Sequence, residues 1–168
     1  MSALRDFIAH LSFTDGRTLL QTGNVVFRGE AQRAGNLERM LEIEAKSRLG
    51  LDTDFFVRPA KDWKALMSRN PFPEEARRDP RHLVVMFLKD APDAKSLATL
   101  QAAIKGPEIV DVAEKQAYIF YPAGIGRSRL THAFIETKLC TRGTGRNWNT
   151  VLKLAALAAE MPRTEGAE

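Results

Sequence analysis

The order in which helices and strands are expected along the chain constrains its fold more than any single motif does. In residues 4–11, apolar side chains recur at the spacing of one helix face. Two β-rich runs, 17–22 and 25–28, then flank Gly23 and Asn24. A glycine that stands first in a two-residue loop favours a hairpin, because glycine accepts a positive φ. The chain is therefore expected to begin with a helix and a hairpin.

Three further elements complete a first half. Apolar residues over 37–49 predict a helix that ends near Gly50, a favourable C-cap. Residues 53–58 are predicted to form a strand, and residues 63–67 a short helix. Residues 70–80 carry three prolines and mixed charge, which is typical of a linker or a long ordered loop.

The second half starts with a near-continuous apolar run at 82–88, which predicts a central strand buried on both faces of a sheet. A helix over 92–104 and a hairpin formed by 109–112 and 118–121 are expected to follow. Two more helices are then expected, each opened by a short loop that contains glycine and arginine.

These elements predict an α+β fold built from two similar halves. The second half contains a ferredoxin-like βαββαβ unit without its last strand, and the first half contains the same unit without its first strand. We therefore expect two tandem ferredoxin-like halves with an additional C-terminal helix. The expected limits are 1–69 for the first half, 70–80 for the linker, 81–161 for the second half with its C-terminal helix, and 162–168 for a frayed tail.

The strand that the first half lacks has a physical consequence. A sheet whose neighbouring strand is absent exposes a row of unpaired backbone groups, and these invite a second chain to pair with them. We therefore expect a homodimer through an open sheet edge. The alternative is that residues upstream of Met1 are absent from this sequence.

The composition argues against the disordered and membrane-spanning classes. The 168 residues are 44% apolar and 27% charged, as in ordinary globular proteins. No apolar run approaches the roughly 20 residues of a membrane-spanning helix, and residues 1–6 lack the features of a signal peptide. The single cysteine, Cys140, suits a reducing compartment. We expect a cytoplasmic protein without a membrane partner.

Positive charge gathers in two short segments near the C-terminus, Gly124–Ser128 and Gly143–Asn147. Between residues 122 and 153 the chain has six lysines and arginines but a single acid, Glu136, although the net charge of the whole chain is only +4. Glycine-rich turns that enter a helix expose backbone N–H groups, and the helix dipole adds positive potential there. Arginine adds a planar fork of donors suited to phosphate or carboxylate.

The sequence therefore predicts an anion site shared by the two glycine-arginine segments. Its candidate ligand-binding residues are Gly124, Gly126, Arg127, Ser128, Gly145, Arg146, Asn147 and Trp148. Ser128 and Asn147 could instead cap their helices, and Trp148 either stacks on a base or anchors the last helix in the core. The competing interpretation is that the glycines only permit tight turns and the arginines are solvated.

No residue pattern identifies a reaction. His10, His82 and His132 lack the spacing of a metal site, Cys140 has no companion, and no nucleophile motif is present. We expect neither a metal nor a cofactor, and the catalytic residues, if any exist, are unknown.

Three segments resemble the signature segments of one bacterial family, domain of unknown function 1697. They are Leu20-Gln21-Thr22-Gly23-Asn24-Val25-Val26-Phe27, Tyr121-Pro122-Ala123-Gly124-Ile125-Gly126-Arg127-Ser128 and Arg146-Asn147-Trp148-Asn149-Thr150-Val151-Leu152-Lys153-Leu154. The resemblance runs in order from Leu4 to about Ala159 and implies an α+β fold of two related halves. Members usually begin with an extra strand and a glycine-containing loop, whereas this chain starts at the first helix, and Thr22 stands where serine is more usual. The family has no established activity, so the resemblance leaves function open.

Three functions fit these observations. The first is a binding module for a phosphorylated or anionic ligand, either a nucleotide or single-stranded nucleic acid, at the two glycine-arginine segments. The second is an enzyme acting on such a ligand. The third is a structural or oligomeric protein without a ligand.

Overall fold

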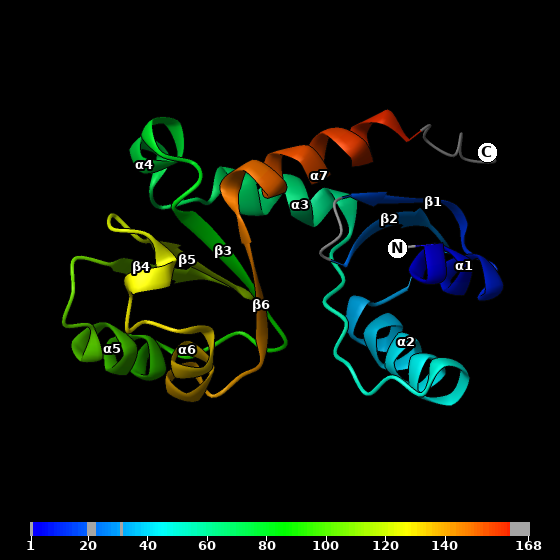
Figure 1. Ribbon diagram of the computed structural model, residues 1–168, viewed down its shortest axis with the longest axis horizontal. Coiled ribbons are helices and arrows are strands. Elements are labelled where there is room, and N and C mark those ends of the chain that lie inside the picture. The colour runs from blue at the N-terminus through cyan, green and yellow to red at the C-terminus, as the bar shows by residue number, and fades with distance from the viewer. Residues whose placement is uncertain (1, 20–22, 31, 162–168) are drawn as a thin grey trace. The chain divides into compact units, whose positions relative to one another are not determined.

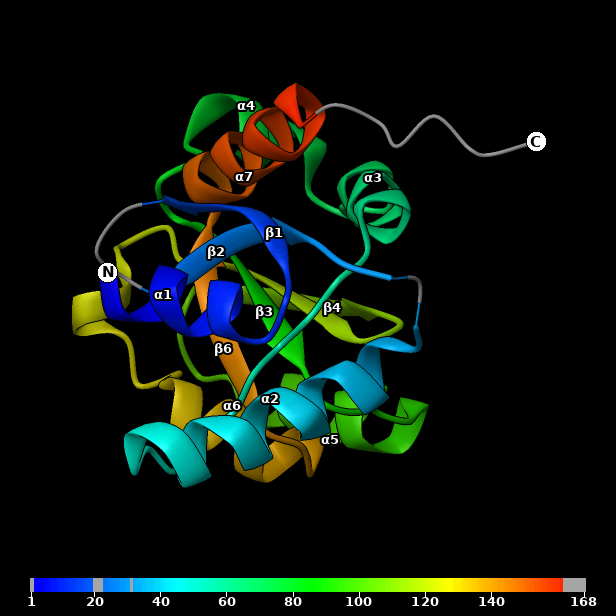
Figure 2. The ribbon, with the colours of Figure 1, turned by 90° about the vertical axis from the view of Figure 1, so that its right-hand side faces the viewer.

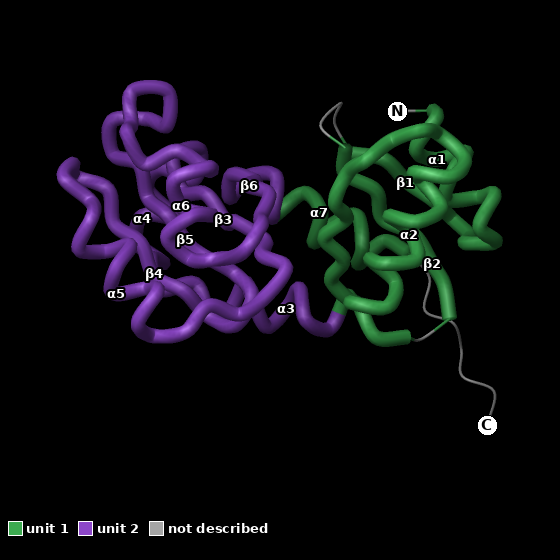
Figure 3. Tube along the Cα trace, turned by 90° about the horizontal axis from the view of Figure 1, so that it is seen from below, with its two compact units in different colours: residues 1–60, 152–168 green, residues 61–151 purple. Residues whose placement is uncertain are grey.

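The computed structural model describes residues 2–19, 23–30 and 32–161 and divides into two compact units (Figure 3). Unit 1 comprises residues 1–60 and 152–168, and unit 2 comprises residues 61–151. This division differs from the expected boundaries at 69 and 81. The segment 70–80, expected as a linker, belongs to unit 2 and contains the short helix α4 (Pro73–Arg78). The expected tail, 162–168, lies outside the described residues.

Unit 1 contains the helix, hairpin and second helix expected from the sequence (Figure 2). Their bounds are α1 (Ser2–His10), β1 (Thr14–Leu19), β2 (Asn24–Arg28) and α2 (Ala34–Leu49). The strands β1 and β2 pair antiparallel in a two-stranded sheet. Gly23 has a φ of 78°, as a hairpin glycine should, and Gly50 ends α2 with a φ of 65°. Residues 20–22 of the expected hairpin lie outside the described residues.

The core of unit 1 is formed by apolar side chains of α1, α2 and β2 and of Phe13 between α1 and β1. Its buried members are Phe7, Ile8, Phe13, Leu37, Leu41 and Ala45. The alternate residues Val25 and Phe27 of β2 pack against this cluster. Because side chains alternate across a strand, Val26 projects to the opposite face of the hairpin.

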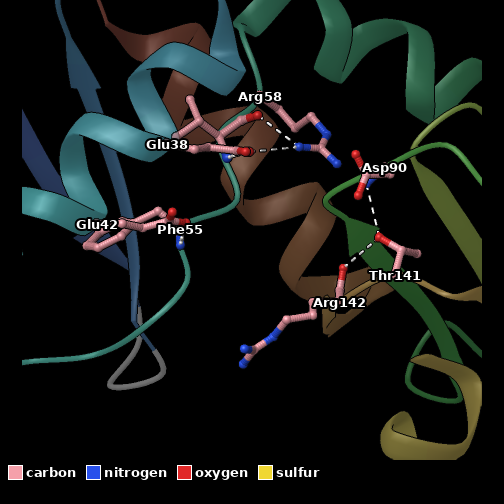
Figure 4. Close-up of polar contacts among 8 residues, drawn as sticks. Glu38, Glu42, Phe55, Arg58, Asp90, Thr141 and Arg142 are labelled. Carbon is pink, nitrogen blue, oxygen red and sulfur yellow. Dashed lines mark hydrogen bonds and ion pairs between the residues drawn. The ribbon is translucent and has the colours of Figure 1, made fainter. Parts of the chain in front are cut away.

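Residues 53–58 do not form the expected strand. The segment is extended, but it pairs with no strand among the described residues. Instead it is attached to α2, since the Phe55 N–H donates to Glu42 Oε1 at 2.9 Å and the Val57 N–H donates to Glu38 Oε1 at 2.8 Å (Figure 4). Glu38 and Glu42 are one helical turn apart, so both carboxylates project from one face of α2. Residues 53–58 have strand-forming side chains, but a segment forms a β-strand only when another strand pairs with it.

Glu38 also forms a buried ion pair with Arg58. The Arg58 Nη1 lies 3.5 Å from Glu38 Oε1, and the side chains are only 6% and 8% exposed (Figure 4). Arg58 donates a second hydrogen bond to its neighbour's carbonyl, Val57 O, at 2.9 Å. A charged pair removed from water is tolerated when hydrogen bonds satisfy its remaining atoms, and these contacts provide them.

Unit 2 contains a complete βαββαβ succession (Figure 1). Its elements are β3 (Leu83–Leu88), α5 (Ala94–Ala103), β4 (Ile109–Ala113), β5 (Gln116–Phe120), α6 (His132–Leu139) and β6 (Gly143–Asn147). The strands pair antiparallel in the order β4-β5-β3-β6. The prediction for the last strand was wrong: Gly143–Asn147, interpreted as a loop, is the strand β6. It pairs with β3 from Val84 opposite Asn147 to Leu88 opposite Gly143.

The central strand β3 is buried on both faces, as the sequence predicted, and all six of its residues are at most 7% exposed. Val84, Met86 and Leu88 project toward α5 and α6, which lie together on one side of the sheet (Figure 1). On the other face α3 (Ala60–Ser68) contributes Trp63, whose ring stacks on Phe87 at a centroid distance of 5.1 Å. The sheet of unit 2 is therefore covered on both sides.

The helix α7 (Trp148–Glu160) follows β6 directly. Its first turn is fixed within unit 2, because the Trp63 indole N–H donates to Val151 O at 3.2 Å. Within the described part of the chain, no helix has the length and apolar character needed to cross a membrane.

Candidate functional site

The first glycine-arginine segment forms a tight turn and not the start of a helix. Ile125–Arg127 make one turn of 3₁₀-helix, and Gly124 precedes it with a φ of 84°. The helix α6 begins only at His132, where Thr131 is the N-cap and accepts from the Phe134 N–H at 3.2 Å. Capping, one of the two interpretations of Ser128, therefore does not apply to α6.

A hollow of about 480 Å³ lies beside this turn, between the end of α5 and the start of α6. It is lined by Ala103, Ile104, Lys105, Gly106, Pro107, Glu108, Ala123, Gly124, Arg127, Ser128, Arg129, Leu130 and Phe134. Three of the predicted ligand-binding residues, Gly124, Arg127 and Ser128, are in this set. Gly126 belongs to the same turn but does not line the hollow.

The positive side chains of the hollow lack acidic partners. Lys105, Arg127 and Arg129 are all exposed, and none forms an ion pair within 4 Å with a described residue. The only carboxylate in the lining, Glu108, instead accepts a hydrogen bond from the Ser128 hydroxyl. The lining thus carries an excess of positive charge that no ion pair with a described residue neutralises.

Ser128 connects the two walls of the hollow. Besides donating to Glu108, its Oγ accepts from the Leu130 N–H at 3.0 Å. The Glu108 carboxylate lies against Gly106, where an added Cβ would be only 2.2 Å from Glu108 Oε2. Glycine at position 106 therefore makes room for the carboxylate that holds Ser128.

An aromatic hydroxyl is buried behind the hollow. Tyr121 donates from its hydroxyl to Leu130 O at 2.9 Å. Burial, with a smaller contribution from the negative charge of Glu108, raises the pKa of Tyr121 above the ordinary tyrosine value. Tyr121 is thus a neutral hydrogen-bond donor that fixes the strand-to-helix connection and is not a base.

The backbone of the turn offers fewer free donors than the sequence suggested. The Gly124 N–H donates to Tyr121 O at 3.0 Å, and the Ser128 N–H donates to Ile125 O at 3.2 Å. Two of the five backbone N–H groups of Gly124–Ser128 are therefore used within the protein.

The second glycine-arginine segment does not line this hollow. Gly145 and Arg146 belong to β6. A Cβ at Gly145 would lie 2.6 Å from His132 Cε1, so glycine permits the close approach of α6 to the strand. Arg146 is half-buried and donates from Nη1 to Thr144 Oγ1 and Gly145 O, both at 2.8 Å. Burial lowers the pKa of Arg146.

Asn147 and Trp148 both have structural roles. Asn147 Oδ1 accepts from the Thr150 N–H at 3.0 Å, which caps α7 as one of the two interpretations predicted. Trp148 is only 7% exposed. This burial agrees with the interpretation of Trp148 as a core anchor and leaves little ring surface for stacking on a base.

Sequence reasoning missed most of the second wall of the hollow. Lys105 and Glu108 follow the end of α5, and Phe134 belongs to α6. The adjacent Gly106 and Pro107 were a signal that the chain turns here. Nothing in the sequence indicated that this turn lies beside Arg127.

Comparisons with known proteins give the family from one match and support the fold with another. A family model described as protein of unknown function (DUF1697) matches residues 1–118. The chain is also similar to a solved structure described as conserved bacterial protein SP0830 from Streptococcus pneumoniae, with 16% identity and a TM-score of 0.71 over 94% of this chain and 88% of that one. At this identity the likeness shows the fold alone. No curated protein matches the chain. Because the family model covers more than half of its residues, this chain belongs to the DUF1697 family.

Proposed function

We propose that this protein binds a small phosphorylated or anionic ligand in the hollow beside the Gly124–Ser128 turn. The observation that carries the proposal is the charge of the lining. Lys105, Arg127 and Arg129 converge on one hollow without ion-pair partners among the described residues. Arginine and lysine side chains that face one concave surface attract anions more strongly than scattered charge does.

The apolar part of the lining favours a ligand larger than inorganic phosphate. Ile104 and Phe134 are half-buried and pack against the main core of unit 2, and Leu130 is part of that core. Binding sites for small molecules commonly combine an apolar floor with a few polar groups that fix orientation. A mononucleotide, with a planar aromatic base that can lie against apolar side chains and with a phosphate, has both features.

A mononucleotide suits the site better than single-stranded nucleic acid. Proteins that bind single strands usually stack successive bases on exposed aromatic rings. Trp148, the candidate for that role, is buried, and Phe134 is the one aromatic side chain in the lining. The volume of the hollow and the single aromatic ring in its lining, that of Phe134, favour a ligand with one base and one phosphate.

Thermal-shift titrations test this proposal. Phosphate, mononucleotides and short single-stranded oligonucleotides are added to the purified protein at low and moderate salt. A ligand at 100 times its Kd should stabilise the fold by about 2.7 kcal/mol and raise the Tm. The rise should shrink with salt, because the cations are exposed.

Two variants make the titration specific. Arg127→Ala should abolish most of the ligand-induced rise, whereas Lys153→Ala, which removes an exposed charge from α7 outside the hollow, should leave it unchanged. A rise that is equal in both variants would place the binding elsewhere. The absence of any rise with every compound would contradict the proposal.

A further inference from the structure

Asp79 and His82 form a side-chain pair that does not belong to the lining of the hollow. Both residues precede β3 in unit 2, all of which is described. His82 Nδ1 lies 2.6 Å from Asp79 Oδ2, and the two side chains are 28% and 34% exposed. An ionised carboxylate can only accept a hydrogen bond, so the proton between the two atoms belongs to Nδ1. In the neutral ring the lone pair is therefore on Nε2.

The backbone holds this imidazole in a defined position. The His82 N–H donates to Asp79 O at 3.1 Å, and His82 O accepts from the Tyr121 N–H at 2.9 Å. Asp79 is fixed in turn, because its own N–H donates to Glu75 O at the end of α4. A side chain that transfers a proton during a reaction needs a fixed position of this kind.

The second nitrogen of the ring lies against the turn beside the hollow. No described residue forms a hydrogen bond with His82 Nε2. A Cβ at Gly124 would lie 3.7 Å from this nitrogen, and Gly124 lines the hollow together with Arg127. Because His82 is outside the lining itself, it would reach a ligand in the hollow through a water molecule.

We propose that His82 is a general base that activates this water for hydrolysis of the phosphate ester of a nucleotide bound beside Gly124, with Asp79 as its positioning residue. This role rests on the proposed binding of a nucleotide in the hollow. Arg127, on the same turn, can stabilise the negative charge of the phosphoryl oxygens.

The proposed reaction needs only the nucleotide and water. His82 Nε2 takes a proton from the water as the water oxygen forms a bond to phosphorus, and the bond between phosphorus and the ester oxygen breaks. The leaving oxygen takes a proton from solvent, and His82 returns its own proton to solvent. Nucleotide and water thus become nucleoside and inorganic phosphate.

Phosphate release from adenosine, guanosine, cytidine and uridine monophosphates tests the catalytic role. His82→Asn should lower kcat about 100-fold or more, as is usual for the loss of a general base, and should leave KM nearly unchanged. The asparagine amide can still donate to Asp79, so the variant removes Nε2 and keeps the local hydrogen bond. His10→Asn, at an exposed histidine of unit 1, is the matched control and should leave kcat unchanged.

Asp79→Asn tests the positioning role. An asparagine amide can donate to Nδ1 and so permit the opposite tautomer of the ring, in which Nε2 carries the proton. The variant should therefore lower kcat and leave KM nearly unchanged. A lower Tm without this difference between kcat and KM would show that Asp79 has a structural role alone.

A chemical probe separates the catalytic role from ligand binding. Diethyl pyrocarbonate acylates an accessible imidazole nitrogen that has a lone pair, and mass spectrometry identifies the modified residue. His82 should be modified in the free protein, and a saturating mononucleotide should protect His82 but not the exposed His10. A nucleotide that raises the Tm but neither protects His82 nor is hydrolysed would overturn the catalytic role and leave the binding proposal standing. Phosphate release that His82→Asn leaves unchanged would also overturn it, and the absence of any rise in Tm would contradict both.

Discussion

The hydroxyl of Ser128 donates a hydrogen bond to the carboxylate of Glu108, twenty residues earlier in the chain, and this contact joins the two walls of the hollow. Glu108 is also the only negative side chain of the lining, which has three positive side chains. Glu108 therefore has two effects. It holds the turn in place, and its charge opposes the binding of an anion.

Glu108→Gln should strengthen anion binding. The amide oxygen can still accept from Ser128, while the removal of one negative charge at a partly exposed site is worth about 1 kcal/mol, or roughly fivefold in Kd. Isothermal titration with a mononucleotide measures the change. Glu30→Gln, at an exposed acid outside the hollow, is the control and should have no effect. Equal affinities in wild type and Glu108→Gln would show that Glu108 does not face the bound anion.

Glu38→Ala should destabilise the protein strongly. The substitution leaves the buried Arg58 guanidinium without its carboxylate and the Val57 N–H without its acceptor. Removing one partner of a buried pair costs about 3–5 kcal/mol. Urea unfolding measures the loss. Glu44→Ala breaks only the more exposed pair with Arg48 and should cost about 0.5 kcal/mol or less. Similar losses of unfolding free energy in the two variants would mean that the ion pair of Glu38 is solvated.

Gly145→Ala and Gly35→Ala should change stability in opposite directions. A Cβ at Gly145 would collide with the His132 ring and approach Val84, which should cost about 1–3 kcal/mol. A Cβ at Gly35 meets nothing within 4 Å and lies in α2, so alanine should stabilise the helix by roughly 0.5–1 kcal/mol. Thermal unfolding compares the two. A Gly145→Ala variant that is as stable as the wild type would show that α6 and β6 can move apart without loss of stability.

Stability should rise with pH as His132 loses its proton. Burial lowers the pKa of His132 below 6.5, with Arg146 acting in the same direction and Glu136 opposing it. The unfolded chain therefore binds more protons than the folded chain between the lowered pKa and 6.5, so stability is lost as pH falls through this window. Urea unfolding at pH values on either side of 6.5 measures the slope. His132→Gln should flatten it, and an unchanged slope would assign the effect to other groups.

The sequence predicted most elements, and two of its errors concern pairing between strands. The apolar run of β3 and the two hairpins have local patterns that agree with the structure. Gly143–Asn147 has glycine and arginine in place of strand-forming residues, yet it forms β6 because β3 offers it an edge. Residues 53–58 show the reverse, since they have strand-forming side chains but no strand neighbour. Strand propensity is decided by context.

The candidate site was predicted only in part for a similar reason. Arg127 and Ser128 were identified by local charge and glycine content, and both line the hollow. Glu108 and Lys105 lie far from them in sequence and approach only when the α5–β4 connection folds beside the turn. Arg146 had the same local pattern as Arg127, but β6 directs it to bonds with Thr144 and its own strand.

The most direct test of the proposed function is to map mononucleotide binding by NMR on isotope-labelled protein. Ligand binding in the hollow should shift the backbone amide signals of Lys105, Glu108, Ser128 and Phe134 in a saturable, salt-sensitive way. Signals from β2 and α2 should stay in place. Saturable shifts confined to residues outside the lining, or no shifts at all, would contradict the account.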